Sequence, residues 1–323
     1  MTMSLRVAGR RYFPDRLLRL RRRAILAGVI ALALCCPAAH AEAPVRVASK
    51  LDAESALLGA MILLTLEANG IKTVDRLQLG PTNILRSAII SGEIDIYPEY
   101  TGNGALFYRS EQDPVWRHAE AGYERIKALD RARYGLVWLA PAPADNSWVI
   151  AVPRALASRH GLATMADFAA WVRRGGAVKL AASAEFVESP AALPAFEKVY
   201  DFTLPPSALL VLAGGETAVT MRAAAEGISG VNAAMAYRTD GALAVLDLVA
   251  LGDPERAQVV YAPAPVVREA VLERYPAIAT SLAPVFRSLD EHRLRQLNAR
   301  ITVDGETARA VAKDYLASHG MPQ

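Results

Sequence analysis

The chain has 323 residues, of which 36 are Lys or Arg and 33 are Asp or Glu, so its net charge is +3. Eight of the basic residues and one of the acidic residues lie in the first 41 positions, which leaves 28 basic and 32 acidic residues and a net charge of −4 for the remainder. The basic character therefore belongs to the N-terminal segment, and nothing in the remainder indicates a nucleic-acid partner or an anionic membrane surface.

The N-terminal segment has the three parts of an export signal. Its arginine-rich start is followed by an apolar run over 24–34 and by the small-residue sequence Ala39-His40-Ala41. This pattern predicts a signal peptide over 1–41, cleaved near Ala41, and the apolar run is shorter than the roughly 20 residues of a transmembrane helix. Arg22-Arg23 leaves general and twin-arginine export both open. Both cysteines lie in this segment, so the exported chain is expected to have neither a disulfide nor a cysteine metal ligand.

After the signal, apolar runs that predict strands alternate with segments whose apolar spacing predicts helices. Strands are expected at 45–48, 73–79 and 94–97, and helices at 55–69, 82–91 and 111–133. Gly70 and Gly92 follow two of these helices directly, and glycine is the residue that most often stands just past a helix C-terminus. The alternation predicts an α/β unit built on a parallel sheet.

A second alternating set follows two extended segments at 137–139 and 146–153. Helices are expected at 164–174, with Thr164 as the N-cap, at 194–199 and at 216–226, and strands at 178–182, 209–212, 233–237 and 246–250. Residues 259–267 are extended again, and the rest is expected to be helical, with breaks at Pro276, Pro284 and Gly305. Two α/β sets joined by extended crossings predict two lobes, 44–149 plus 259–323 and 150–258, with a ligand cleft between them.

Catalytic motifs are absent from the sequence. It contains no HExxH, GxSxG, Walker A or GxGxxG pattern. The histidines beyond the signal are scattered, and the carboxylates Asp145, Glu185 and Glu188 stand near predicted loops, where such groups are usually solvated. We therefore predict a protein that is not an enzyme and that needs no cofactor or metal.

Four aromatic residues are more informative than the charged ones. Tyr100, Trp148, Tyr237 and Tyr261 lie at the ends of predicted strands, beside turn residues. Packing under a loop explains any one of them. Four together, from both predicted lobes and from the crossings, indicate a ligand site in the cleft.

Five segments in order resemble the glycine betaine/choline/carnitine-binding proteins of osmoprotectant ABC transporters, closest to the periplasmic Gram-negative branch. The segments are Val47-Ala48-Ser49-Lys50, the run IDIYPEYTG at 94–102, 135–152, Ala236-Tyr237-Arg238-Thr239-Asp240-Gly241 and 261–268. The resemblance covers nearly all of the chain after the signal. It implies a two-lobed periplasmic binding-protein fold, a small quaternary-ammonium ligand, delivery to the permease subunits of an importer, and a monomeric protein in the periplasm.

The resemblance also implies a cage of Tyr100, Trp148, Tyr237 and Tyr261 around the ligand's trimethylammonium group. A quaternary ammonium has no N–H donor, so aromatic faces are the groups that can recognise it, at about 0.5–2 kcal/mol each. Lys50 and Asn103 occupy positions that in the family can hold a ligand carboxylate. Ser189 is a possible further ligand contact, because it stands where the family has an arginine.

Three alternatives stay open at the level of sequence. The same two lobes could bind another small solute, such as an amino acid, or the protein could be a periplasmic enzyme acting on a small amine. A sensory or structural module without a ligand is a third option. The identity of the osmoprotectant and its affinity do not follow from the sequence.

Overall fold

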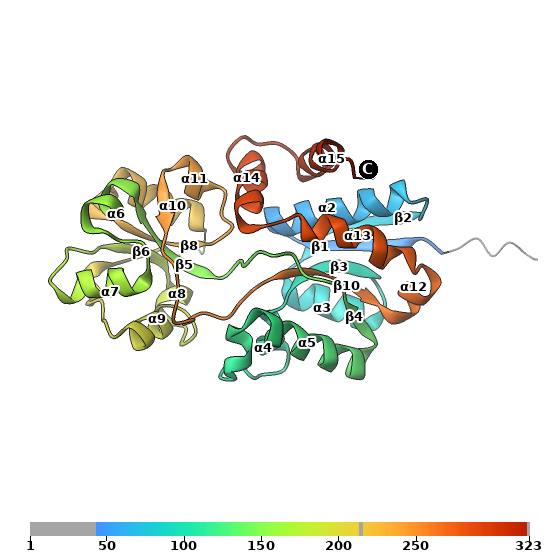
Figure 1. Cartoon of the computed structure of the whole chain (residues 1–323), viewed down its shortest axis with the longest axis horizontal. Coiled ribbons are helices and arrows are strands. Elements are labelled where there is room, and N and C mark those ends of the chain that lie inside the picture. The colour runs from blue at the N-terminus through green and yellow to red at the C-terminus, as the bar shows by residue number, and fades with distance from the viewer. Residues whose placement is uncertain (1–42, 213–215, 322–323) are drawn as a thin grey trace, which may run out of the picture. The chain divides into compact units, whose positions relative to one another are not determined.

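The computed structural model describes residues 43–212 and 216–321, so the predicted signal peptide lies outside the described residues. Two five-stranded sheets organise this part of the chain (Figure 1). The first sheet has the strand order β2-β1-β3-β10-β4 and the second has the order β7-β6-β8-β5-β9. The strands of the first are β1 (Val45–Lys50), β2 (Thr73–Gly80), β3 (Ile96–Tyr100), β4 (Leu136–Trp138) and β10 (Pro263–Arg268). Those of the second are β5 (Trp148–Pro153), β6 (Leu180–Ser183), β7 (Leu209–Leu212), β8 (Ala233–Tyr237) and β9 (Leu248–Ala250).

The two sheets are mixed, which corrects the expectation of parallel sheets. In each, four strands run in one direction, while the strand that arrives through a crossing runs antiparallel to its two neighbours: β10 against β3 and β4, and β5 against β8 and β9. A parallel neighbour needs a long crossover connection, usually a helix, whereas an antiparallel strand does not. Because β5 and β10 follow extended segments rather than crossover helices, each can pair antiparallel to its neighbours.

The helices around the first sheet come from both ends of the described chain. They are α2 (Ala53–Ala68), α3 (Thr82–Ser91), α4 (Asn103–Phe107), the 3₁₀ turn η1 (Pro114–Arg117), α5 (Ala119–Tyr134), α12 (Glu269–Arg274), α13 (Ala277–Arg287), α14 (Glu291–Thr302) and α15 (Ala308–Ser318). Two expectations were wrong here. The segment 111–133 is divided into η1 and α5, and Pro284 lies inside α13 without ending it.

The second sheet carries α6 (Arg154–His160), α7 (Met165–Arg173), α8 (Ala184–Glu188), α9 (Leu193–Tyr200), η2 (Pro206–Ala208), α10 (Thr217–Glu226), η3 (Ile228–Gly230) and α11 (Ala242–Val245). Thr164 caps α7 as predicted, in a capping box with Asp167. The short helices α4, α6, α8 and α11 were not predicted, because four to seven residues are too few to show a helical period.

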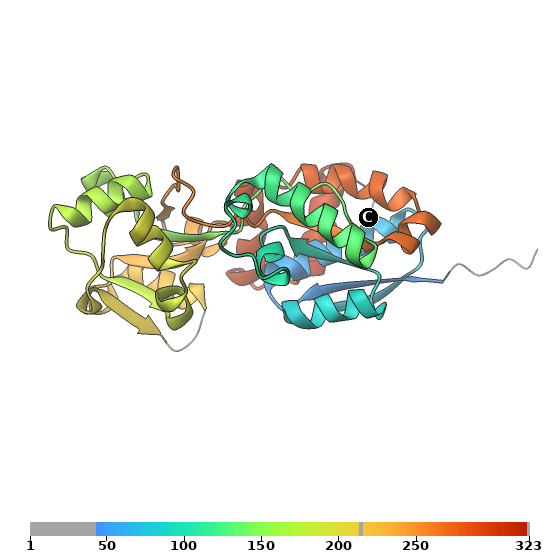
Figure 2. The ribbon, with the colours of Figure 1, turned by 90° about the horizontal axis from the view of Figure 1, so that it is seen from below.

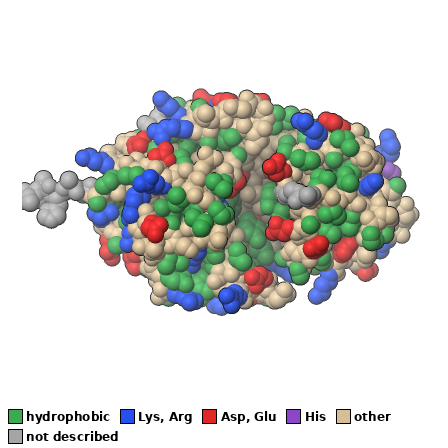
Figure 3. All heavy atoms as spheres, turned by 180° about the vertical axis from the view of Figure 1, so that it is seen from behind, with side chains coloured by type: hydrophobic (Ala, Val, Ile, Leu, Met, Phe, Trp, Pro, Cys, Tyr) green, Lys and Arg blue, Asp and Glu red, His purple; other side chains and the backbone are tan. Residues whose placement is uncertain are grey.

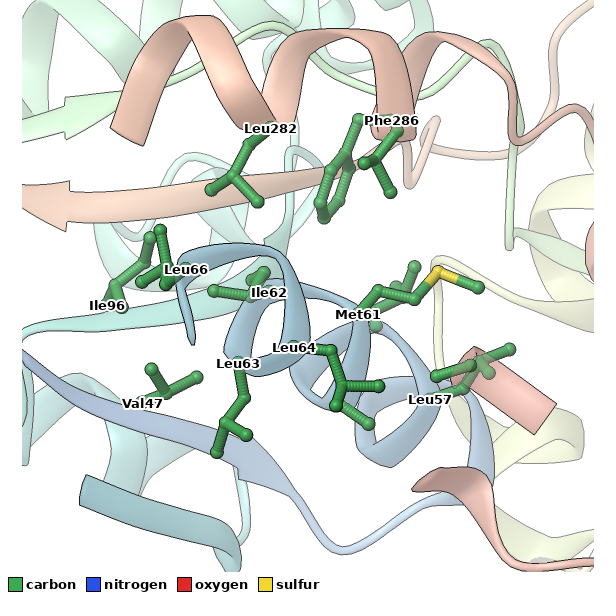
Figure 4. Packing of buried hydrophobic residues seen from close by; sticks show 14 of the residues in the cluster. Val47, Leu57, Met61, Ile62, Leu63, Leu64, Leu66, Ile96, Leu282 and Phe286 are labelled. Carbon is green, nitrogen blue, oxygen red and sulfur yellow. The ribbon is translucent and has the colours of Figure 1, made fainter. Parts of the chain in front are cut away.

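Helix α2 forms the centre of the first hydrophobic core. Every residue from Glu54 to Leu66 is buried, so the helix is covered on all sides rather than on one face. Figure 4 shows Ile62, Leu63 and Leu66 between Val47 of β1 and Leu282 of α13. A helix buried this completely is held rigidly, and its N-terminal turn is therefore a fixed platform for whatever side chain it carries.

Two extended crossings, 139–147 and 251–262, connect the two sheets and run side by side in both ribbon views (Figure 1, Figure 2). They are joined by the N–H of Asn146, which donates to the carbonyl of Tyr261 at 3.0 Å. Helix α14 also contacts the part of the chain built on the second sheet, because Arg295 Nε donates to the carbonyl of Arg238, which follows β8, at 2.5 Å. The surface is hollowed between the parts built on the two sheets (Figure 3). No helix in 43–212 or 216–321 is long and apolar enough to cross a membrane.

Candidate functional site

Trp148 and Tyr237 form a stacked aromatic pair on the second sheet. They are register partners at the start of β5 and the end of β8, with ring centroids 4.1 Å apart and an angle of 25° between the rings. Phe186 of α8 also packs against the Trp148 ring in an edge-to-face contact, with ring centroids 5.4 Å apart. Because the pair lies at the carboxyl end of β8, it occupies the edge at which open α/β sheets bind ligands.

Tyr100 ends β3 of the first sheet, and its side chain is buried. Its hydroxyl donates to Oε1 of Glu54 at 2.9 Å, and Nζ of Lys50 lies 4.6 Å from the ring centroid. Burial, reinforced by the nearby charge of Glu54, raises the pKa of Tyr100 well above its usual value. The phenol therefore keeps its proton and donates a hydrogen bond to Glu54.

Tyr261 lies on the second crossing and is anchored through its backbone. Its N–H donates to Oδ1 of Asp145 at 2.9 Å. Its ring covers Gly102, where an added Cβ would come within 2.8 Å of two ring carbons. The glycine of the YTG sequence thus has a packing reason, since only a residue without a side chain lets the ring lie so close to the backbone. Burial first, then the charge of Asp145, raises the pKa of Tyr261 to about 12.

Tyr237 and Tyr261 lie within electrostatic reach of each other and of Glu185. Burial is the main cause that raises the pKa of Tyr237 above its usual value, and Glu185 is the largest of the charges that add to it. The same carboxylate also raises the pKa of Tyr261. Three of the four predicted cage residues, Trp148, Tyr237 and Tyr261, are thereby brought into one neighbourhood.

Lys50 and Asn103, which were expected to hold a ligand carboxylate, are both bound to Glu99. The Lys50 ammonium pairs with Oε1 of this fully buried glutamate, and Nδ2 of Asn103 donates to the same oxygen at 2.7 Å. The backbone N–H of Tyr100 also donates to Oε1 at 2.7 Å, and the Tyr97 hydroxyl donates to Oε2 at 3.1 Å. Contact of either residue with a ligand stays a prediction.

Ser189, at the position of the family's arginine, ends α8 and is partly exposed. Its hydroxyl accepts a long hydrogen bond of 3.4 Å from the N–H of Ala191. The helix that it ends carries Phe186, which packs against Trp148. Ser189 thus lies on an element that supports the aromatic pair, but its side chain offers no positive charge.

Sequence reasoning missed the group that connects Tyr100 to the second sheet. Asn298 of α14 donates from Nδ2 both to Oε2 of Glu54 at 2.6 Å and to the carbonyl of Thr239 at 2.9 Å. The Thr239 side chain also lies near Glu54 and favours its ionised form, which lowers its pKa. Thr239 follows Tyr237 by two residues. No periodic or motif signal marks Asn298, and Glu54 is not marked either, because an acidic residue in the first turn of a helix is ordinary.

A cavity of about 670 Å³ lies beside the crossings, but it is not the aromatic site. Its lining includes Asp145, Ser147, Arg238 and Val260, with charged side chains of η1 and α5, and it contains none of the four predicted cage residues. Among the described residues, no cluster of three or more His, Cys, Asp or Glu could hold a metal ion.

Residues 43–318 match the family described as the substrate-binding domain of ABC-type glycine betaine transport systems. The chain belongs to this family. It is 56% identical over 281 residues to the glycine betaine-binding protein YehZ of Escherichia coli K12, with 87% of this chain and 92% of the relative covered. It is 31% identical over 280 residues to a glycine-betaine-binding protein of Pseudomonas aeruginosa, with 85% and 87% covered.

The fold is confirmed by solved structures of the family. Apo YehZ of Escherichia coli superposes with a TM-score of 0.79 at 56% identity, covering 86% of this chain and 99% of that one. A glycine betaine/carnitine/choline ABC transporter structure superposes with a TM-score of 0.75 at 18% identity, covering 85% and 98%. The predicted α/β periplasmic binding-protein fold and the predicted family are therefore both correct.

Proposed function

We propose that this protein is the substrate-binding component of an ABC importer and captures a quaternary ammonium of the glycine betaine type. The stacked Trp148–Tyr237 pair at the carboxyl end of β8 carries the proposal, because it presents two aromatic rings at the edge where this fold binds ligands. Tyr261 and Tyr100 complete the cage from the second crossing and from the first sheet. The relatives named as glycine betaine-binding proteins support the same ligand class.

Cation–π attraction supplies the specificity for such a ligand. Each ring contributes about 0.5–2 kcal/mol to binding a desolvated ammonium, so four rings together provide a few kcal/mol, against about 4 kcal/mol for millimolar and about 8 kcal/mol for micromolar binding. The carboxylate end has weaker support. Ser189 has no charge, and Lys50 and Asn103 are shared with Glu99. We therefore place the discrimination among ligands at the ammonium end.

The two lobes, 44–149 plus 259–323 and 150–258, close on the ligand in this proposal. Closure brings Tyr100 toward the Trp148–Tyr237 pair and excludes water, which strengthens the attraction between rings and cation. The permease subunits then recognise the closed, loaded protein. We place the protein in the periplasm as a monomer, after cleavage near Ala41, with no enzymatic activity, no cofactor and no nucleic-acid partner.

Calorimetry on the exported chain tests this function directly. Glycine betaine, choline, carnitine, proline betaine and tetramethylammonium are titrated into the wild type, into Trp148→Ala and into Trp148→Phe. We expect the wild type and the Phe variant to bind, and the Ala variant to lose most of the affinity for every quaternary ammonium, since only a ring preserves the cation–π contact. Wild-type protein that binds no quaternary ammonium at millimolar concentration would disprove the ligand class.

Two further experiments separate the alternatives. An amino-acid ligand would bind with an affinity that Trp148→Ala leaves unaltered. An enzyme would convert the ligand, so mass spectrometry of a quaternary ammonium recovered after long incubation would show a product. Recovery of the unchanged ligand at full yield is the outcome expected for a binding protein.

A further inference from the structure

Glu54 is a buried carboxylate that the cage described above does not use. It lies in the first turn of α2 and is 6% exposed. Within residues 43–212 and 216–321 it forms no ion pair; it accepts hydrogen bonds from the hydroxyl of Tyr100 and from Nδ2 of Asn298, and the Thr239 side chain lies near it. All three groups are neutral. A buried charge without an opposite charge is costly, so the ionised form of Glu54 is destabilised while no cation is bound nearby.

The partners of Glu54 belong to both sides of the proposed cage. Tyr100 ends a strand of the first sheet, whereas Thr239 belongs to the turn directly after Tyr237 on the second sheet. Asn298 ties the two together, because its Nδ2 donates to both Glu54 and the carbonyl of Thr239. The carboxylate therefore stands behind one predicted cage ring and next to the loop that carries another.

The charged groups around Glu54 do not neutralise it. On its own element, Asp52 adds a second negative charge, and on the adjoining strand the ammonium of Lys50 is already paired with Glu99. On α14, Arg295 is bound to Glu291 and to the carbonyl of Arg238. In the turn after β8, Asp240 accepts from the N–H of Tyr237 at 2.7 Å and is itself acidic. The missing positive charge is not supplied by any of these elements.

We propose that Glu54 is the counter-charge of the ligand cage, a positioning residue that acts through Tyr100 and becomes balanced when the ligand's ammonium group binds. The inference rests on the proposed function, since it needs a cationic ligand on the Tyr100 ring. A tyrosine whose hydroxyl donates a hydrogen bond to a carboxylate has a more electron-rich ring than a free tyrosine, and its attraction for a cation is stronger. The ligand and the ionised form of Glu54 therefore stabilise each other.

This mutual stabilisation makes binding depend on pH. Burial, only partly offset by the hydrogen bonds from Thr239, Asn298 and Tyr100, raises the pKa of Glu54 to about 7. Near neutral pH a fraction of the unliganded protein is protonated at this carboxyl. A bound cation favours the ionised form, so binding releases a proton and affinity rises as the pH increases through the pKa. By linkage, each unit by which the ligand lowers this pKa corresponds to a tenfold gain in affinity.

Calorimetry of the exported chain with tetramethylammonium and glycine betaine provides the test. We expect the affinity for both to be about tenfold lower well below the pKa of Glu54 than well above it. At the pKa, titrations in buffers of different ionisation enthalpy should show that less than one proton is released per ligand bound. This readout uses the wild type alone, so it does not depend on whether any variant folds.

Glu54→Gln is expected to bind with the low affinity of the protonated wild type at every pH and to release no proton. The variant keeps an acceptor for Tyr100, and Asn298 can turn its amide toward the new group, because its Oδ1 has no hydrogen-bond partner in the described part of the chain. Glu67→Gln is the matched control: it removes an exposed carboxylate from the same helix and should leave the pH profile unchanged.

The outcomes separate the two proposals. Wild-type protein that binds both ligands with a pH-independent affinity and no proton release overturns the role of Glu54 and leaves the proposed function standing. Glu54→Gln with the affinity and pH profile of the wild type does the same. Wild-type protein that binds neither ligand overturns both.

Discussion

Gly102→Ala tests whether the Tyr261 ring belongs to the ligand site. The backbone at Gly102 has φ −63° and ψ −24°, which any residue adopts, so alanine brings no backbone strain. The added methyl would lie 2.8 Å from Cδ1 and Cε1 of Tyr261 and 2.8 Å from Cγ1 of Val259. These distances are well inside the 3.5–4.0 Å at which carbon atoms pack favourably. The Tyr261 ring must therefore move. The substitution changes the position of this ring and leaves its chemical identity unchanged.

The expected cost has two parts. Overpacking of this kind typically lowers the free energy of unfolding by about 1–3 kcal/mol, which thermal unfolding would record. Displacement of one cage ring removes up to about 2 kcal/mol of cation–π attraction, so calorimetry should show a loss of affinity for glycine betaine of about tenfold or more.

Gly122→Ala provides the control on α5. Its added methyl meets its nearest neighbour, the carbonyl oxygen of Val115, at 3.4 Å, so the space accepts it, and the gain in helix propensity is up to about 1 kcal/mol. This variant should bind as the wild type does. Gly102→Ala with wild-type affinity would mean that Tyr261 does not contact the ligand, and it would remove this ring from the proposed cage.

Three further predictions concern Trp148, Glu54 and the ion pair between Arg86 and Asp130. Trp148→Ala should lower the free energy of unfolding by about 2–3 kcal/mol, the lower end for a half-buried tryptophan, as measured by denaturant unfolding; an unchanged midpoint would contradict the packing seen between Trp148, Phe186 and Tyr237. Burial raises the pKa of Glu54 from 4.5 to about 7, so the folded state binds more protons than the unfolded state between these two pH values. The free energy of unfolding should therefore fall by up to about 3 kcal/mol as the pH rises from 4.5 to 7. Thermal unfolding should show this fall for the wild type and not for Glu54→Gln. Asp130→Asn should destabilise the protein by about 3–5 kcal/mol because it leaves the buried guanidinium of Arg86 unpaired, while an affinity for glycine betaine different from that of the wild type would show that this pair is coupled to the ligand site.

The order of strands and helices was predictable wherever local chemistry determines it. Thr164 and Gly92 mark helix ends through side-chain capping and a left-handed backbone, and both act as predicted. The directions of β5 and β10 were not predictable in this way, because they depend on which sheet an extended segment joins. Pro284 fits inside α13 for a similar reason: helix α13 packs on the buried helix α2 through Leu282 and Phe286, and this tertiary packing outweighs the local preference against proline.

The residues of the candidate site also differ in whether local sequence or tertiary packing determines their character. Tyr100, Trp148, Tyr237 and Tyr261 could be singled out from the sequence because they are aromatic residues beside turns at strand ends, and their contact with a ligand stays a prediction. Glu54 was missed, since an acidic residue in the first turn of a helix is ordinary. Its special character arises only from burial and from Asn298, a partner 244 positions further along the chain.

Glu99 explains why a lysine in this cleft need not serve as a carboxylate receptor. It is fully buried, and Lys50 is the basic residue that balances it, with Asn103 and the backbone N–H of Tyr100 donating to the same oxygen. A ligand carboxylate that took Lys50 away would leave Glu99 as an unpaired buried charge, at a cost of several kcal/mol; one that shared it would lie close to a like charge. Either way the net gain from Lys50 is small. In the proposed site, Ser189 adds no positive charge where the family has an arginine, while Glu54 acts on Tyr100 and Glu185 acts on Tyr237 and Tyr261 as negative charges. In this proposal, these carboxylates favour the cationic end of a ligand over its anionic end.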